Sequence, residues 1–507
     1  MVTTILDYLD AAASRYPDRT AYRDMENSCS FSELFHMARA IGSRLGALNA
    51  PGRPVAVLME KSVSMAAACL GVVEGGMCYC PVDISMPAER LSLILSVLEP
   101  AAVIGEPAAL QFLNGKQPDC PVFLFEELIS QPEDNLLLAK IRKGLLSSSP
   151  LYILFTSGST GVPKGVVVSH SVVMNNMEWL ETEYRLGPED VLGNQAPFHF
   201  DVADHDLYCP LKFGCSAVLI PQEYFSFPAR LIELLNRERV TAIFWVPFAL
   251  GMMAAFQAFE AETPKFLRYV FFAGEVMPVK QMNYWRRFVP EPLYVNMYGS
   301  TETHITLYHP LTREYSEEER IPIGKPCGNV RVLVLEEGDV PVTPESGGIG
   351  ELCILGGALS LGYYKNPELT KTRFTENPLN PCYPERMFRT GDLVRYNEDG
   401  DLVYQNRADH QIKRLGYRIE LGEIEAAAGG MDGLLEWACA YDEKKQTILF
   451  FYTGEEKERK ELSSFLGRRI PKYMMPGWFL HLDSMPRTGS GKIDRKGLLS
   501  LYQKQGN

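Results

Sequence analysis

The chain lacks an excess of basic residues and lacks the cysteine spacing of a metal or disulfide framework. Its 507 residues include 50 Lys and Arg against 63 Asp and Glu, which gives a net charge of −13. A general nucleic-acid-binding protein needs a basic surface to neutralise phosphates, so this class is disfavoured. The eleven cysteines are scattered, with no CxxC pair. We therefore expect small buried thiols in a reducing, cytoplasmic setting, and neither disulfides nor zinc.

The chain also has no stretch that is typical of a signal peptide or a membrane span. Two acidic residues precede the first basic residue, Arg15, which argues against a secretory signal. Residues 240–259 carry no charge and are long enough to cross a bilayer. Pro247 interrupts them, however, and residues 242–246 favour a buried strand that precedes a helix. We expect no membrane span and no internal repeat.

Short apolar runs alternate with segments of helical periodicity through the first 320 residues. This alternation predicts parallel sheets covered by helices on both faces, with strands at 54–58, 101–104, 217–220 and 268–272. Beyond residue 320, glycines and turn pairs multiply, which predicts a β-rich subdomain. The last hundred residues predict a small α+β unit with helices at 422–428 and 457–470 and a strand at 447–452. A polar turn at 407–409 predicts two domains, 1–408 and 409–507.

A loop of hydroxyls and glycines follows an apolar strand at 151–155 and ends at Lys164. Glycines let backbone N–H groups turn toward an anion, hydroxyls add donors, and the lysine adds charge. The pattern GxxxxGK[ST] is absent, so the loop is not a P-loop. A solvated Ser/Gly loop is the alternative, but so many donors after a buried strand favour phosphate binding. The donors are Thr156, Ser157, Ser159, Thr160 and Lys164.

Three further motifs follow in the chain. Residues 296–303 place an aromatic ring, hydroxyls and one carboxylate after an apolar strand, and Glu302 is a candidate Mg²⁺ ligand unless the segment is a helix-capping box. Asp392, directly after a glycine, is a candidate acceptor for a ribose diol, although a β-turn aspartate is the ordinary reading. Lys492 follows two glycines in residues 488–496, which is typical of a mobile loop that delivers one cation or of a solvated basic tail.

These four motifs, in this order, resemble the adenylate-forming superfamily of acyl-CoA synthetases, luciferases and peptide-synthetase adenylation domains. The resemblance covers nearly the whole chain, with further matching blocks at 31–34, 76–83 and 350–364. Residues 272–278 and 473–476 look most like the D-alanine–carrier-protein ligase branch. The resemblance implies an α/β multi-domain fold: a large N-terminal domain of two α/β subdomains and a β-barrel, and a small mobile α+β C-terminal domain.

The resemblance also implies an ATP-dependent, AMP-forming ligase with two half-reactions. A carboxylate attacks the α-phosphorus of Mg·ATP and releases pyrophosphate, and a pantetheine thiol then displaces AMP to give a thioester. Stabilising the developing charge and excluding water from the mixed anhydride are the physical requirements. The implied cofactors are ATP and Mg²⁺. Since the chain ends at Asn507, soon after the Lys492 motif, we expect a phosphopantetheinylated carrier protein that acts in trans.

Residue roles follow from position in the family's motifs. Those implied to be catalytic are Lys492, Glu302, Thr301 and Lys164. Those implied to bind the nucleotide are Thr156, Ser157, Ser159, Thr160, Lys164, Gly274, Glu275, Tyr298, Thr301, Asp392, Arg407 and Lys492. Lys492 is implied to act in the first half-reaction only, as a compact charge on a flexible stem. Asp409 matches the hinge between the domains, and Phe200 matches an aromatic gate toward the thiol tunnel.

Asp201 separates the possible functions. In members that activate amino acids, an aspartate at this position pairs with the substrate ammonium, whereas a buried carboxylate that faces a plain acid substrate lacks a partner. We therefore expect amino acid activation, with an acyl-CoA synthetase for a small carboxylic acid as the alternative. A non-catalytic nucleotide or amino acid sensor is disfavoured by the joint presence of Lys164, Glu302, Asp392 and Lys492.

The position of the side-chain pocket also follows from the resemblance. Its expected lining is Asp201, Val202, His205, Trp245, Phe271, Ala273, Met297, Ile305 and Thr306. Bulky Trp245 and Phe271 fill space, which predicts a small substrate such as alanine, glycine or serine, unless Trp245 packs in the core behind the pocket. Ala273 stands where the D-alanine ligases have cysteine. His205 either adds a polar contact or pairs with the flanking Asp204 and Asp206.

Overall fold

The computed structural model describes residues 2–110, 119–158, 161–408, 411–487 and 493–505. The chain divides into two compact units. The first comprises Met1–Asp83, Leu98–Leu154 and Gly165–Ala408, and the second comprises Ile84–Val97, Phe155–Lys164 and Asp409–Asn507. The division into domains 1–408 and 409–507 stays a prediction.

A seven-stranded sheet carries the buried apolar runs of the amino-terminal region. Its order is β18 (Gly362–Tyr363), β8 (Lys164–Ser169), β7 (Pro150–Thr156), β4 (Cys78–Pro81), β3 (Pro54–Leu58), β5 (Ala102–Gly105) and β6 (Val122–Leu124). Every residue of β3 is buried, as expected for a parallel strand covered on both faces. The helices before α8 are α1 (Ile5–Arg15), α2 (Phe31–Gly46), α3 (Val63–Glu74), α4 (Ala88–Leu98), α5 (Pro107–Leu110), α6 (Phe125–Ile129) and α7 (Asn135–Gly144).

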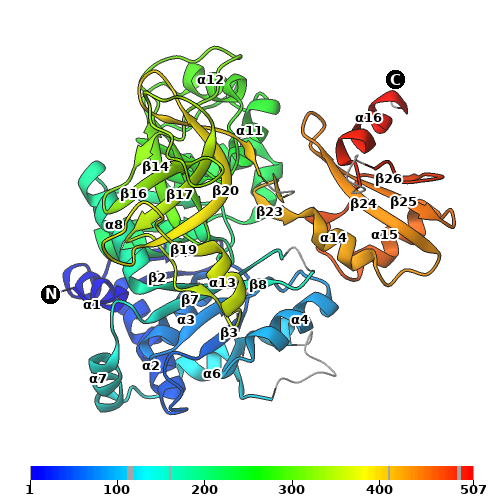
Figure 1. Ribbon diagram of the computed structural model, residues 1–507. Coiled ribbons are helices and arrows are strands. Elements are labelled where there is room, and N and C mark those ends of the chain that lie inside the picture. The colour runs from blue at the N-terminus through cyan, green and yellow to red at the C-terminus, as the bar shows by residue number, and fades with distance from the viewer. Residues whose placement is uncertain (1, 111–118, 159–160, 409–410, 488–492, 506–507) are drawn as a thin grey trace. The chain divides into compact units, whose positions relative to one another are not determined.

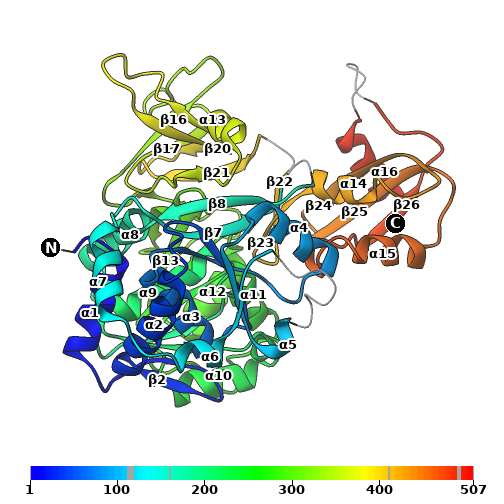
Figure 2. The same ribbon diagram turned by 90° about the horizontal axis from the view of Figure 1, so that it is seen from below.

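Helices α1, α2 and α3 gather beside α9 (Asp204–Phe213), as Figure 2 shows. The close approach of α2 to α3 depends on Gly42. A Cβ atom added at Gly42 would lie 2.5 Å from the Cβ of Glu74, well inside the contact distance that carbon atoms tolerate.

A nine-stranded sheet separates two hydrophobic cores. Its order is β15 (Lys325–Pro326), β14 (His304–Pro310), β13 (Leu293–Ser300), β12 (Tyr269–Ala273), β11 (Ala242–Trp245), β9 (Val191–Asn194), β10 (Ser216–Leu219), β1 (Thr20–Arg23) and β2 (Ser28–Ser30). Side chains alternate along each strand, so Phe244 and Phe271 join one core while Trp245 and Phe272 join the other. The helices of this region are α8 (His170–Glu183), α9, α10 (Pro228–Arg237), α11 (Pro247–Ala255) and α12 (Val279–Phe288).

The predicted β-rich subdomain is a five-stranded antiparallel sheet, drawn in yellow-green in Figure 1. Its strands are β16 (Val330–Leu335), β17 (Gly350–Gly356), β20 (Arg386–Tyr396), β19 (Phe374–Glu376) and β21 (Leu402–Arg407), with helix α13 (Pro367–Arg373) between β18 and β19. Strand β21 follows β20 through a turn and pairs with it, which brings Arg407 opposite Asp392.

The carboxyl-terminal part of the second unit is a three-stranded sheet with helices on both faces (Figure 1). Its strands are β24 (Leu434–Asp442), β25 (Thr447–Gly454) and β26 (Trp478–His481), preceded by the hairpin β22 (Gln411–Arg414) and β23 (Tyr417–Glu420). Ile448 and Phe450 face α14 (Leu421–Ala428) and α15 (Arg459–Gly467), whereas Leu449 and Phe451 face α16 (Arg495–Gln505). Successive side chains of β25 point to opposite faces of the sheet, so they pack into two separate cores.

The predicted fold class is confirmed: two α/β sheets and a curled β sheet form the large part, and a small α+β domain follows. The uncharged stretch 240–259 holds strand β11 and helix α11. Among the described residues, no helix combines the length and hydropathy that a membrane span requires. All eleven cysteines are free; nine of them are buried, whereas Cys120 is partly buried and Cys382 is exposed.

Candidate active site

The hydroxyl loop lies in the second unit, between the end of β7 and the start of β8. Its turn depends on glycine, because a Cβ atom at Gly158 would lie 2.0 Å from the carbonyl oxygen of Val162. The Thr156 hydroxyl is buried and has no hydrogen-bond partner in the part of the chain that the structure describes. An unpartnered buried hydroxyl beside a tight glycine turn fits a phosphate ligand.

Two other members of this loop contact the segment at the end of β23. The Ser157 hydroxyl donates to the carbonyl oxygen of Arg418 (2.8 Å) and accepts from the backbone N–H of Glu420 (3.2 Å). The Lys164 ammonium lies 3.7 Å from the Glu420 carboxylate. Ser159 and Thr160 lie outside the described residues.

The second motif forms a tight hairpin between β13 and β14 in the first unit. Gly299 pairs with Ile305, and a Cβ atom at Gly299 would lie 1.8 Å from the carbonyl oxygen of His304, so only glycine fits there. At the tip, the Glu302 side chain is fully buried and accepts a hydrogen bond from the Tyr363 hydroxyl (2.7 Å). The Thr301 hydroxyl donates to the Asp201 carboxylate (2.6 Å).

The structure joins this hairpin to the third motif. The Arg407 guanidinium donates to one oxygen of the buried Asp392 carboxylate at 2.7 Å, and the Tyr298 hydroxyl donates to the other oxygen. Burial, with the Asp392 charge, raises the pKa of Tyr298 well above its ordinary value, so this phenol remains a donor. Each carboxylate oxygen has a second lone pair, so Asp392 retains the capacity to accept from a diol.

Gly274 and Glu275 follow the end of β12. Gly274 adopts a φ of +101°, a conformation that side chains other than glycine rarely take. The Glu275 carboxylate accepts from the backbone N–H of Phe248 (3.2 Å) in the first turn of α11. This hydrogen bond fixes Glu275 at the carboxyl end of the parallel strand β12. Ligands of α/β folds bind at this edge of the sheet.

Most of the residues predicted to line the side-chain pocket lie together on one face of the nine-stranded sheet. Ala273 pairs with Met297 across β12 and β13, and both join the same core as Phe271 and Ile305. Val202 packs against this core, and the Thr306 hydroxyl donates to the carbonyl oxygen of Tyr298 (3.3 Å). Asp201 is half-buried at the start of a short 3₁₀ helix, Asp201–Ala203.

Trp245 is the exception. Its ring lies in the other core, edge-on to Trp285, and its indole N–H donates to the carbonyl oxygen of Gly193 (2.7 Å). Because Phe244 pairs with Phe271 in parallel register, it is Phe244 whose side chain shares the pocket face. Trp245 thus lies in the core on the opposite face of the sheet, which favours the alternative that the sequence left open for this residue. Alternation along the strand separates Phe244 from Trp245 in the sequence, and the register with Phe271 assigns Phe244 to this face.

The predicted pocket face is filled with rings. His205 stacks on Phe244 with centroids 4.4 Å apart, and Phe244 stacks on Phe271 at 4.5 Å. Both nitrogens of His205 have neighbours, the carbonyl oxygen of Val202 (3.2 Å) and the side-chain amide of Asn176 (3.0 Å). His205 therefore contacts these groups and not the carboxylates of Asp204 and Asp206. Burial, helped by His304, lowers its pKa to about 3, so the ring is neutral near pH 7.

Three further residues were selected from the sequence: Phe200, Asp409 and Lys492. Phe200 packs partly buried against the first core, with its ring 4.9 Å from that of His199. Asp409 and Lys492 lie outside the described residues.

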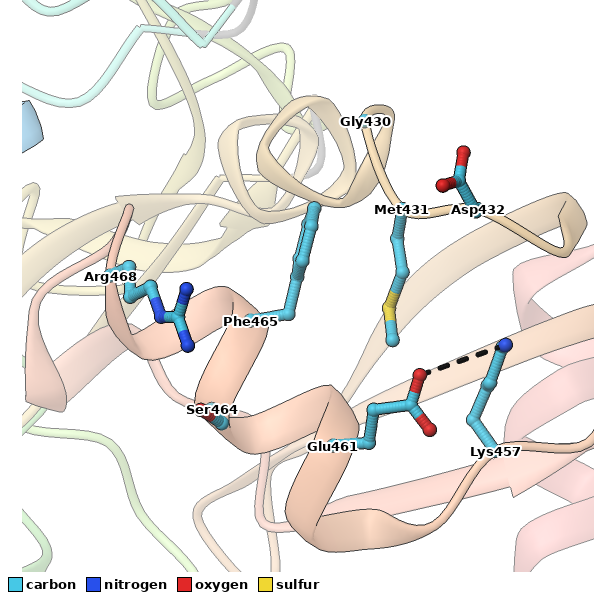
Figure 3. A pocket seen from close by; sticks show the side chains of 8 residues that line it. All are labelled: Gly430, Met431, Asp432, Lys457, Glu461, Ser464, Phe465 and Arg468. Carbon is cyan, nitrogen blue, oxygen red and sulfur yellow. Dashed lines mark ion pairs between the residues drawn. The ribbon is translucent and has the colours of Figure 1, made fainter.

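A surface cavity of about 320 Å³ lies in the second unit, between α15 and the turn after α14. Figure 3 shows Met431 and Phe465 as its apolar part and the ion pair between Lys457 and Glu461 at its rim (3.6 Å). Lys457 also pairs with Glu455 at 2.6 Å. None of the residues selected from the sequence that the structure describes lines this cavity.

Comparisons with known proteins agree on one family. A family model described as AMP-binding enzyme matches residues 9–364. Tyrocidine synthase 3 of Brevibacillus parabrevis is 32% identical over 98% of the chain, which spans 8% of that protein. The L-proline–[L-prolyl-carrier protein] ligase of Streptomyces coelicolor is 34% identical, over 92% of the chain and 91% of the ligase. The chain thus spans a small part of the first relative and nearly all of the second.

Solved structures show the same fold. The Vibrio cholerae adenylation domain AlmE, in complex with glycyl-adenosine-5'-phosphate, superposes with a TM-score of 0.85 at 21% identity and covers 99% of this chain and 98% of its own. IdnL1 superposes with a TM-score of 0.79 at 25% identity, over 96% of this chain and 99% of its own.

Proposed function

Since the chain belongs to the AMP-binding enzyme family, as an adenylate-forming ligase of the type found in nonribosomal peptide synthetases, we propose that it activates a small amino acid with ATP and transfers it to the phosphopantetheine thiol of a separate carrier protein. The predicted membership of the adenylate-forming superfamily is confirmed. The substrate, the carrier and the role of each residue are proposals.

The single observation that carries the amino acid proposal is the hydrogen bond between Thr301 and Asp201. The family resemblance assigns Thr301 to the α-phosphate and Asp201 to the substrate ammonium. An α-amino acid has its ammonium and carboxylate on neighbouring atoms. A carboxylate that binds the ammonium next to a hydroxyl that binds the phosphate therefore brings the substrate carboxylate within reach of the α-phosphorus.

The nucleotide is assigned to the groups described above. Asp392 accepts from the ribose diol, and Arg407 and Tyr298 hold its carboxylate in place. The backbone at Gly274 and Glu275 lines the adenine, and the hydroxyl loop with Lys164 receives the β- and γ-phosphates. Glu302, a buried carboxylate whose chemistry suits Mg²⁺, would hold that ion, which when bound neutralises charge on the phosphates. Lys492 supplies the remaining positive charge in the first half-reaction.

The ring stack of His205, Phe244 and Phe271 supports a small substrate side chain. Three buried rings occupy volume that a long or aromatic side chain needs, and a neutral His205 whose nitrogens both have neighbours offers no charge to an acidic substrate. Alanine, glycine and serine remain the proposed candidates. Proline, the amino acid in the name of the Streptomyces coelicolor relative, is a further compact candidate.

Pyrophosphate exchange tests the proposal. Each proteinogenic amino acid, D-alanine, β-alanine, acetate and propionate is supplied singly with ATP and labelled pyrophosphate. We expect the strongest exchange with one small amino acid and release of AMP on later addition of pantetheine. Asp201→Asn is expected to lower kcat/KM for that amino acid roughly a hundredfold or more, because the ammonium loses its charged partner. Asp18→Asn, at an exposed carboxylate, is the matched control.

The alternative gives a different pattern. An acyl-CoA synthetase would exchange with acetate or propionate at least as fast as with any amino acid, prefer coenzyme A to pantetheine, and tolerate Asp201→Asn. That result would overturn the amino acid proposal. Absence of exchange with every substrate, together with intact ATP binding, would favour a sensor.

A further inference from the structure

The hairpin that carries Thr301 and Glu302 is fastened twice to the segment that carries Asp201. The first link is the hydrogen bond from Thr301 to Asp201 (2.6 Å). The second, three residues further on in both segments, runs from Nε2–H of His304 to the Asp204 carboxylate (3.1 Å). His304 is the first residue of β14, and Asp204 is the first residue of α9. The second link therefore joins the starts of these two elements, three residues after Thr301 and Asp201.

The second link is more deeply buried than the first. Asp204 and His304 are each 4% exposed, and the Tyr152 hydroxyl, fully buried in β7, also donates to Asp204. A hydrogen bond in such surroundings is stronger than one in water. Loss of His304 removes one of the two donors to the buried Asp204 carboxyl group, and loss of Asp204 leaves Nε2–H of the buried His304 without this acceptor, which is costly.

His304 also fixes the backbone of the hairpin. It adopts a φ of +55°, a left-handed conformation that is uncommon for a residue with a side chain. Its carbonyl group packs against Gly299, and the backbone carbonyl of Glu302 accepts from the N–H of Ser360 (2.9 Å). The hairpin is therefore held by residues 360–363 and also by Asp201 and Asp204.

We propose that Asp204 and His304 are a positioning pair that sets the distance between the ammonium-binding Asp201 and the phosphate-binding Thr301. The pair touches neither substrate nor nucleotide. It acts by anchoring the start of α9, so that Asp201 lies at one preferred distance from the hairpin. This inference rests on the proposed function, because it assumes that Asp201 binds the substrate amine.

Two substitutions of His304 separate positioning from simple structural support. In His304→Gln the side-chain amide still donates to Asp204, whereas in His304→Leu a side chain of similar bulk cannot. With the amino acid that gives the fastest exchange in the panel above, we expect His304→Leu to raise KM for the amino acid tenfold or more and to leave KM for ATP within about twofold. His304→Gln is expected to remain within about threefold of the wild type in both constants.

Asp204→Asn keeps the volume of the side chain and serves if His304→Leu does not fold. It is expected to raise KM for the amino acid selectively, by a smaller factor. A purely structural role would lower the unfolding midpoint and the active fraction without changing either KM. That result would overturn the proposal that Asp204 and His304 are a positioning pair. So would an equal loss in His304→Gln and His304→Leu. Wild-type protein that exchanges with no amino acid would overturn the proposed function as well, which distinguishes the two failures.

Discussion

Phe244 and Trp245 are neighbours in one strand, and their truncation is expected to have different consequences. Phe244→Ala removes a ring from the pocket face, where it lies between His205 and Phe271. Trp245→Ala removes a ring from the opposite core, where it packs against Trp285 and donates to Gly193. Both side chains are fully buried, so each truncation is expected to cost about 3–5 kcal/mol of stability. Trp245→Ala loses about 1 kcal/mol more with its hydrogen bond.

Substrate selection separates the two variants. A leucine side chain carries about three more carbons than alanine, and at ~0.8 kcal/mol for each carbon that enters new space this is roughly 2.4 kcal/mol, or about fiftyfold in kcat/KM. We expect Phe244→Ala to shift the ratio of leucine to alanine by up to this factor. Trp245→Ala is expected to leave the ratio within about threefold of the wild type, because its cavity opens into the core.

The measurement pairs pyrophosphate exchange over the amino acid panel with urea unfolding of both variants. Comparable losses of stability make each variant the control for the other, since general loosening would relax selectivity in both. Phe244→Leu, a smaller truncation, serves if Phe244→Ala unfolds. A broadened selectivity in Trp245→Ala, with unchanged selectivity in Phe244→Ala, would show that the assignment of the two faces is wrong.

Three other substitutions test separate parts of the molecule. Lys492→Ala is expected to abolish adenylate formation and to spare thioester formation from supplied aminoacyl-AMP; equal loss of both steps, measured by exchange and by thiolation, would contradict the assignment. Asp409→Pro is expected to slow thiolation more than adenylation, because a fixed φ restricts a hinge, and the ratio of the two rates measures this. Burial raises the pKa of Glu74 to about 6, although Arg142 opposes the shift, so the folded state binds this proton more tightly than the unfolded chain does. The stabilisation that this proton supplies is complete below about pH 4.5 and is lost as pH rises through 6, a change of about 2 kcal/mol. Glu74→Gln is expected to remove this loss, so its unfolding midpoint relative to wild type rises between pH 5 and pH 8; a constant difference would refute the argument.

The motifs that suggest the chemistry are local, and for that reason they could be predicted from the sequence. A glycine and hydroxyl loop after a buried strand, and a glycine directly before a carboxylate, are patterns of residues that are close together in the chain. The strands at 54–58 and 268–272 could also be predicted from the sequence, because turn signals bound their apolar runs. In the structure these strands are Pro54–Leu58 and Tyr269–Ala273.

Which distant groups meet depends on the folded chain. Alternation along a strand gives the parity of Phe244 and Trp245, but which parity faces the predicted pocket depends on the register with Phe271 in the next strand. The same holds for the bond from Tyr298 to Asp392, which joins positions 94 residues apart, and for the one from His304 to Asp204, which joins positions 100 residues apart. Long-range packing sets these distances, and no local pattern in the chain encodes them.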